Sequence, residues 1–124
     1  MSILVVEDDE QIRRMLVRTL VGAGHTVLEA EDGSVALEYL RTARPLPSLL
    51  LLDLMMPQMD GITLRRAQMA DPKLAGIPVI MLSVVGDPNT GVAGLNALAV
   101  VSKPFHIADV LTLVSQALRS APVA

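Results

Sequence analysis

The sequence predicts an α/β fold in which five helices flank a single doubly wound parallel sheet of five strands. Short apolar runs typical of strands alternate along the chain with segments whose apolar residues recur at helical spacing. The strand runs are apolar at successive positions, as expected when helices cover both faces of a parallel sheet. A single domain is expected, because 124 residues is an ordinary domain length and no internal repeat divides them.

The first half of the chain predicts two strand–helix units and a third strand. A strand at residues 3–6 leads into a helix that Asp9 is suited to cap. A second strand is expected at 26–30, and the helix after it must end before Pro45. The third strand is expected at 48–52, where Ser48 is followed by four consecutive leucines.

The second half predicts three more helices and two more strands. A helix capped by Asp60 should follow the third strand, and further strands are expected at 78–82 and 97–101. Between these strands we expect a helix with Asp87 as its cap and Pro88 at its first position. Two glycines lower the propensity of that helix. A clear apolar stripe marks the last helix: Ile107, Val110, Leu111, Val114 and Leu118.

Composition limits the classes of function. Apolar residues make up 52% of the chain and aromatic residues only 2%, so the core must be aliphatic. The net charge of -3, without a basic run or a ladder of aromatic residues, argues against direct binding of nucleic acid. The chain has no cysteine, no signal-peptide pattern and no apolar run near the ~20 residues of a membrane-spanning helix. We therefore expect a cytoplasmic protein without a membrane segment. The arginines at 13, 14 and 18 and at 65 and 66 are interpreted as solvated helix faces.

Charged side chains stand at the carboxyl ends of the predicted strands, which is the edge where open α/β sheets bind ligands. Glu7 and Asp8 follow the first strand, Asp53 follows the third, and Lys103 follows the fifth. Asp53 lies among apolar residues, where a carboxylate is costly unless its charge is used. Each residue alone has an ordinary interpretation as a helix cap, a turn residue or a surface lysine. Because the fold places them all on one edge, a functional site is the better interpretation.

The chemistry of such a site is constrained by its crowded carboxylates, which repel one another unless a cation lies between them. A small set of oxygen ligands completed by water suits Mg²⁺. A carboxylate beside Mg²⁺ can attack phosphorus and become an acyl phosphate. The charge that develops on the phosphoryl oxygens needs donors, which Lys103 and the hydroxyl of Ser83 supply. Asp53 is therefore predicted to accept a phosphoryl group.

Four motifs, taken in order, resemble the receiver domains of bacterial two-component response regulators, of the chemotaxis-regulator type. They are ILVVEDD at 3–9, LLDLMMPQMDG at 51–61, PVIMLS at 78–83 and SKPF at 102–105. The resemblance covers essentially the whole chain and implies the flavodoxin-like form of the doubly wound fold. Residues 1–120 are expected to form the receiver domain, with 121–124 as a tail or the start of a linker.

The resemblance implies a metal site and an acceptor. Asp53 matches the phosphorylated aspartate and would also be a Mg²⁺ ligand. Glu7 and Asp8 match the acidic pair that holds Mg²⁺, with Asp8 as the more direct ligand and Glu7 acting mainly through water. The backbone carbonyl of Met55 would be a further ligand.

The resemblance also implies a switch, from which this sequence departs. Ser83 and Lys103 match the hydroxyl and the lysine that contact the phosphoryl group, and the bond before Pro104 is expected to be cis. The fifth-strand position that usually holds an aromatic switch residue is Val100. The residue after the switch hydroxyl is usually small and is here Val84, and the stretch between Ser83 and Lys103 is slightly shorter than usual. We expect an intact site with an altered output switch.

In that family a histidine kinase or a histidine phosphotransfer protein donates the phosphoryl group, and small donors such as acetyl phosphate often substitute. The domain is a signalling module and no conventional enzyme, although it promotes its own phosphorylation and dephosphorylation. Phosphorylation shifts its conformational populations around the fourth helix, fifth strand and fifth helix. This face would contact an output domain or a protein partner. The sequence leaves both a monomer and a homodimer open.

Other functions compete with this interpretation. A pseudo-receiver would bind a protein partner without ever being phosphorylated, and it would be recognised by loss of an acidic residue or the lysine, both of which are present. A phosphatase with an aspartate nucleophile would need a second acid two residues later, where Met55 stands. A flavin-binding domain would need a phosphate loop after the first strand, where acids stand instead.

Overall fold

The computed structural model describes residues 2–42, 45–53, 61–83, 98–102 and 106–120. Within these ranges five strands form one parallel sheet in the order β2-β1-β3-β4-β5. The strands are β1 (Ser2–Val6), β2 (Thr26–Ala30), β3 (Leu49–Asp53), β4 (Val79–Ser83) and β5 (Ala99–Ser102). The helices are α1 (Glu10–Gly22), α2 (Gly33–Thr42), α3 (Gly61–Ala70) and α4 (Ile107–Ser120).

The predicted class of fold is confirmed. All five expected strands are present, and their ends differ from the predicted ones by no more than two residues. Asp53 and Ser83 are the last residues of β3 and β4, where they were expected just after the strands. Four of the five expected helices are described, and the last expected helix is α4. The helix expected at Asp87 and Pro88, and the cap expected at Asp60, lie outside the described residues.

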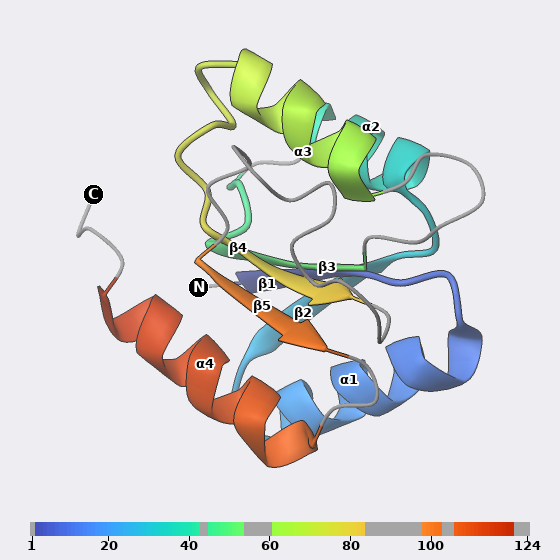
Figure 1. Cartoon of the computed structure of the whole chain (residues 1–124), viewed down its shortest axis with the longest axis vertical. Helices are drawn as coiled ribbons and strands as arrows, with labels where there is room; N and C mark the ends of the chain where they lie inside the picture. Colours follow the sequence, from blue (N-terminus) through green and yellow to red (C-terminus); the bar gives the residue numbers. More distant parts are fainter. Residues whose placement is uncertain (1, 43–44, 54–60, 84–97, 103–105, 121–124) are drawn as a thin grey trace.

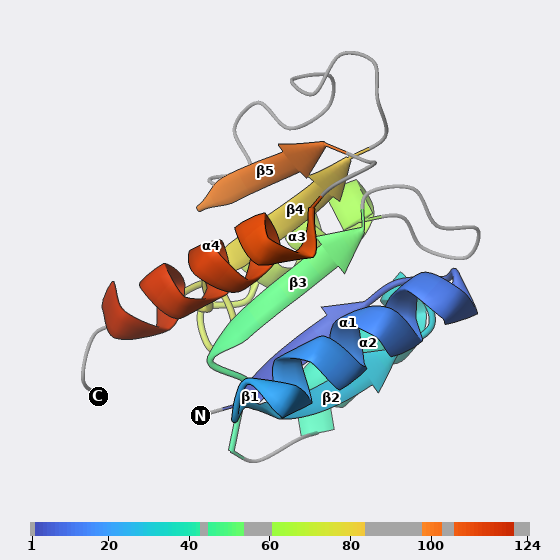
Figure 2. The same ribbon diagram turned by 90° about the horizontal axis from the view of Figure 1, so that it is seen from below.

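Helices cover both faces of the sheet (Figure 1): α2 and α3 lie on one side, and α1 and α4 on the other. Figure 2 shows α1 and α4 side by side across the second face. Among the described helices, none has both the length and the apolar composition that crossing a membrane requires.

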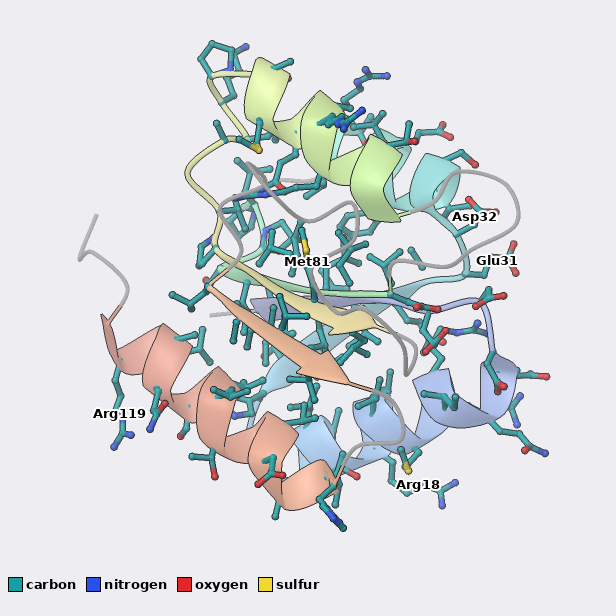
Figure 3. All side chains as sticks on the ribbon, in the orientation of Figure 1. Arg18, Glu31, Asp32, Met81 and Arg119 are labelled. Carbon is teal, nitrogen blue, oxygen red and sulfur yellow. The ribbon has the colours of Figure 1, made fainter. Side chains whose placement is uncertain are left out.

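Each face has its own hydrophobic core, because successive strand residues point to opposite sides. The α2/α3 core contains Leu50, Leu52 and Met81 together with Leu37, Leu40 and Leu64 of the helices. Figure 3 shows Met81 between the sheet and these two helices. The α1/α4 core contains the alternate strand residues with their helix partners: Leu49, Leu51, Ile80, Leu16, Leu20, Val110 and Val114. All five residues of β3 are buried, which explains the continuous apolar run.

The order of the strands fixes where a site can form. From β1 the chain passes to β2 on one side, and β3 then pairs with β1 on the other side. The loops after β1 and β3 therefore diverge to opposite faces and leave a crevice outside the carboxyl ends of these two strands. Glu7 follows β1 directly, and Asp53 ends β3.

Candidate acidic site at the carboxyl ends of β1 and β3

Three carboxylates meet at this crevice. Glu7, Asp8 and Asp53 each place one carboxylate oxygen so that the three atoms lie within 4.8 Å of one another. Glu7 and Asp53 are buried, with 0% and 1% of their surface exposed, whereas Asp8 is exposed. Two members of the cluster are thus buried at the carboxyl ends of the strands, and the third, Asp8, is exposed to solvent. The structure brings together the three acids that the sequence singled out.

The turn between β1 and α1 is held by main-chain and side-chain bonds. The Glu7 N–H donates to the Ala30 carbonyl at the end of β2, at 3.1 Å. The Asp9 N–H donates to Oε2 of Glu7 at 3.4 Å. One Asp9 carboxylate oxygen accepts from the N–H groups of Gln11 and Ile12, at 2.9 and 3.1 Å, so Asp9 is the predicted N-cap of α1. Asp9 therefore caps α1, while Glu7 and Asp8 belong to the acidic cluster.

The donor set of the cluster fits a hard divalent cation. Three carboxylates this close repel one another strongly when ionised, and two of them are removed from solvent. A cation that takes oxygen ligands relieves the repulsion, and an exposed member such as Asp8 leaves room for the waters that Mg²⁺ retains. The residues present thus match a Mg²⁺ site with protein ligands on one side and solvent on the other.

The other predicted site residues are only partly described. Met55, Val84, Lys103 and Pro104 lie outside the described residues. Ser83 ends β4, which is the neighbour of β3 in the sheet, but its side chain is not described.

The predicted switch position lies on the edge strand. Val100 belongs to β5 and is 38% exposed, and Leu98 just before the strand is 54% exposed. An exposed valine thus occupies the position for which the resemblance implies an aromatic side chain.

The interpretation of two arginines as solvated was wrong. Arg13 is only 13% exposed at its side chain, because its guanidinium lies against the β1–α1 turn. Arg65 is 4% exposed and donates to Oε1 of Gln68 at 2.7 Å, and burial lowers the pKa of its guanidinium. Both contacts escaped the sequence analysis for a physical reason. Arg13 bonds to Glu29, which is distant in sequence, and Arg65 bonds to Gln68, which is buried.

A structural role at the end of β2 was also missed. Asp32 accepts from the Ser34 hydroxyl at 2.6 Å and the Val35 N–H at 2.9 Å, so it caps α2. These bonds hold the pKa of Asp32 below its ordinary value, with the hydroxyl bond as the largest cause. Figure 3 shows Asp32 beside Glu31 at the exposed end of this strand. An Asp two residues before Ser and three before Val, at a strand end, is a signal that could have predicted the cap.

The sequence is similar to those of known response regulators. A family model described as "response regulator receiver domain" matches residues 3–115. The DNA-binding response regulator MtrA of Mycolicibacterium smegmatis is 40% identical over 119 residues, which are 94% of this chain and 50% of that protein. The response regulator receiver protein CpdR of Brucella abortus is 40% identical over 120 residues, which are 96% of this chain and 98% of that protein.

Solved structures agree with the sequence relatives. The signal receiver domain of a signal transduction histidine kinase from Syntrophus aciditrophicus superimposes with a TM-score of 0.90 at 29% identity. The superposition covers 99% of this chain and 93% of that one. The chain spans about half the length of MtrA and nearly the whole length of CpdR.

Proposed function

Because the chain belongs to the response regulator receiver domain family, we propose that it accepts a phosphoryl group on Asp53, in a reaction that requires Mg²⁺ held by Glu7, Asp8 and Asp53. One observation carries this proposal: the three carboxylates converge within 4.8 Å where the strand order reverses. A phosphoacceptor and its metal ligands must be in reach of one another, and these three residues are.

The proposed step is a phosphoryl transfer onto a carboxylate. A carboxylate oxygen of Asp53 attacks phosphorus, the bond between phosphorus and the donor breaks, and an acyl phosphate forms. With a phosphohistidine donor the broken bond is P–N, and the departing imidazole takes up a proton. Mg²⁺, when bound, neutralises charge on the carboxylates and on the phosphoryl oxygens. Asp53 is buried at the end of β3, which restricts the positions that its carboxylate can take beside Glu7 and Asp8.

The remaining predicted roles belong to the same proposal. Ser83 and Lys103 would donate to the phosphoryl oxygens, and the Met55 carbonyl would complete the protein ligands of Mg²⁺. Support for Ser83 comes from its place at the end of β4, beside β3. The receiver unit would comprise residues 1–120, with 121–124 as a tail or linker.

Two-component signalling supplies the partners. The donor would be a histidine kinase or a histidine phosphotransfer protein, with acetyl phosphate as a small substitute, and the reaction would take place in the cytoplasm. The output face would include β5 and α4, on which a separate domain or protein docks. The exposed apolar residues Leu98 and Val100 on this edge support that choice. Because Val100 cannot supply an aromatic switch, the coupling of phosphorylation to this face would rest on other contacts.

The experiment incubates the protein with acetyl phosphate and Mg²⁺ and measures its intact mass beside Asp53→Asn and a sample with excess EDTA. One phosphoryl adduct is expected on the wild type, and none on the variant or without metal. An adduct that persists in the variant would place the acceptor elsewhere.

Beryllofluoride binding separates rapid hydrolysis from a site that never reacts. This phosphoryl mimic should bind the wild type with Mg²⁺ even if the acyl phosphate is too short-lived to detect. If neither an adduct nor beryllofluoride binding is seen, the chain is a pseudo-receiver that serves as a binding module.

A further inference from the structure

The side chain of Arg13 in α1 makes two bonds, and neither partner belongs to its own helix. Its Nη1 donates to the backbone carbonyl of Glu7 at 2.9 Å, and its Nε donates to Oε1 of Glu29 at 3.0 Å. Its side chain is 13% exposed, whereas the Glu29 side chain is 50% exposed. The next residue, Arg14, is 70% exposed and forms an ion pair along the helix with Glu10. Two adjacent arginines on one helix therefore have different environments.

The carbonyl that Arg13 contacts belongs to the residue that carries one of the three clustered carboxylates. The peptide groups of Glu7 are held on both sides, since its N–H bonds to Ala30 of β2 and its carbonyl bonds to Arg13. The Asp8 nitrogen is bonded to that carbonyl carbon, so the same hydrogen bond also restrains the peptide plane from which Asp8 extends. Through Glu29, which precedes Ala30 in β2, Arg13 also ties the turn to the neighbouring strand.

Arginine is well suited to hold both acceptors at once, because it uses two different nitrogen atoms for them. The guanidinium presents several N–H donors in a rigid plane, whereas a lysine ammonium is a single point at the end of a flexible stem. Bonds between charged donors and carbonyl or carboxylate oxygens are stronger than neutral ones, and the bond from Arg13 to the Glu7 carbonyl is partly buried. The bond can therefore restrain the β1–α1 turn, in addition to the backbone bonds of the turn and the 3.4 Å contact to Oε2 of Glu7.

We propose that Arg13 is a positioning residue for the Mg²⁺ site, acting through the backbone carbonyl of Glu7 to present Glu7 and Asp8 toward Asp53. The inference rests on the proposed function, because it presupposes that the cluster binds Mg²⁺. Groups that orient metal ligands, without touching the metal, commonly matter for affinity almost as much as the ligands.

The sign of the effect distinguishes positioning from simple electrostatics. Arg13 is a cation near a cation site, so removal of its charge alone should tighten Mg²⁺ binding. Removal of a positioning group should weaken it, because the carboxylates would then need to be ordered by the metal.

The test is a Mg²⁺ titration of the full chain, followed by the amide NMR signals of Glu7, Asp8 and Asp53. In Arg13→Ala we expect the Kd for Mg²⁺ to rise about tenfold, the low end of the range for groups that orient metal ligands. Arg13→Lys keeps the charge but loses the planar arrangement of donors that faces both acceptors, so its Kd should fall between those of the wild type and Arg13→Ala. Arg14→Ala, which removes the same charge from an exposed neighbour, should leave the Kd unchanged.

Each outcome decides a separate question. An unchanged or lower Kd in Arg13→Ala, with wild-type circular dichroism, overturns the inference and leaves the proposed function standing. If Arg13→Ala does not fold, Arg13→Lys decides by the same criterion, since it differs from the wild type in geometry and not in charge. Absence of Mg²⁺-dependent shifts in the wild type itself would remove the proposed function, and the inference with it.

Discussion

At the scale of single residues, a carboxylate in this protein is defined by the hydrogen bonds that it accepts. Asp9 and Asp32 both accept from N–H groups at the start of a helix. Glu7 accepts from the Asp9 N–H and also converges with Asp8 and Asp53. The sequence alone distinguished Asp9 from the cluster, because Asp9 directly precedes a helical stripe. Asp32 was not recognised as a cap, because Gly33 and Ser34 obscure the start of α2.

Asp32 should make stability depend on pH. Its pKa in the folded chain lies below the ordinary value of 3.8, so its ionised form stabilises the fold. This contribution is present above the unfolded pKa and is lost as pH falls through the folded one. Between about pH 5 and pH 3 the wild type should therefore lose more unfolding free energy than Asp32→Asn, which keeps the cap but does not titrate. Urea denaturation at several pH values measures the difference, and parallel curves would show that Asp32 contributes nothing.

Gln68 is a second residue whose role depends on burial. It is fully buried, accepts from Arg65 at 2.7 Å, and donates to the carbonyls of Leu74 and Ile77 at 2.9 and 3.0 Å. It thus fixes the connection from α3 to β4. Gln68→Leu keeps a similar side-chain volume but removes the amide group that makes these bonds. Its buried partners lose those bonds, so we expect a loss of about 1–3 kcal/mol in unfolding free energy.

The matched control is Gln11→Leu, which makes the same chemical change at an exposed position of α1. It should change stability by less than about 0.5 kcal/mol. Equal losses in the two variants would mean that the buried network has no special weight. From the sequence alone, a glutamine in a helix is expected to be exposed to solvent. The burial of Gln68 becomes evident only from the folded structure.

At the scale of elements, the end of α1 depends on a backbone conformation that a side chain disfavours. Gly24 has φ of 96°, the His25 N–H donates to the Leu20 carbonyl, and the Gly24 N–H donates to the Val21 carbonyl. This pattern is a Schellman motif. A Cβ at position 24 would meet no atom within 4 Å, so the cost of Gly24→Ala is conformational and should be about 1–2 kcal/mol.

Gly22 supplies the comparison, because it belongs to α1 and its added Cβ would also meet no atom within 4 Å. Gly22→Ala should be neutral or should stabilise the fold by up to about 1 kcal/mol, since alanine favours a helix. The thermal unfolding midpoint should therefore fall in Gly24→Ala and stay unchanged or rise in Gly22→Ala. A similar loss in both would contradict the assigned role of Gly24.

The elements were largely predictable because their signals are local. Continuous apolar runs gave the strands of a sheet covered on both faces, and the helical stripe at the end of the chain gave α4 with its buried Val110 and Val114. The pairing of β1 with both β2 and β3 is not a local property, and it followed only from the family-level fold. The contacts of Arg13 and Arg65 could not be predicted, since they depend on backbone groups brought near by packing.

At the scale of the whole molecule, metal binding should be linked to stability. A ligand that binds only the folded state stabilises it, by about 2.7 kcal/mol when its free concentration is a hundred times its Kd. Mg²⁺ should therefore raise the thermal midpoint of the wild type by several degrees. The rise should shrink in Asp8→Asn and stay intact in Glu38→Gln, which removes a carboxylate from the exposed side of α2. The same rise in all three proteins would indicate general ion effects and no specific site.

At the scale of the whole fold, the packing of the sheet positions the crevice between the carboxyl ends of β1 and β3. Two hydrophobic cores hold the sheet from both sides, and this close packing fixes the strand ends that carry two of the clustered carboxylates. The chain belongs to the receiver domain family, and the exposed Val100 stands on the edge strand β5.

The most direct test is to locate the phosphoryl group. The protein is phosphorylated with acetyl phosphate and Mg²⁺ and reduced with borohydride, which converts an aspartyl phosphate to homoserine and releases phosphate. It is then digested with trypsin. Cleavage after arginine puts Asp53 in the peptide 42–65 and Glu7 and Asp8 in the peptide 1–13, so mass spectrometry separates the candidates. Homoserine at position 53 alone is predicted. Homoserine at another acid, or an unmodified Asp53 in phosphorylated protein, would contradict the assignment of Asp53 as the acceptor.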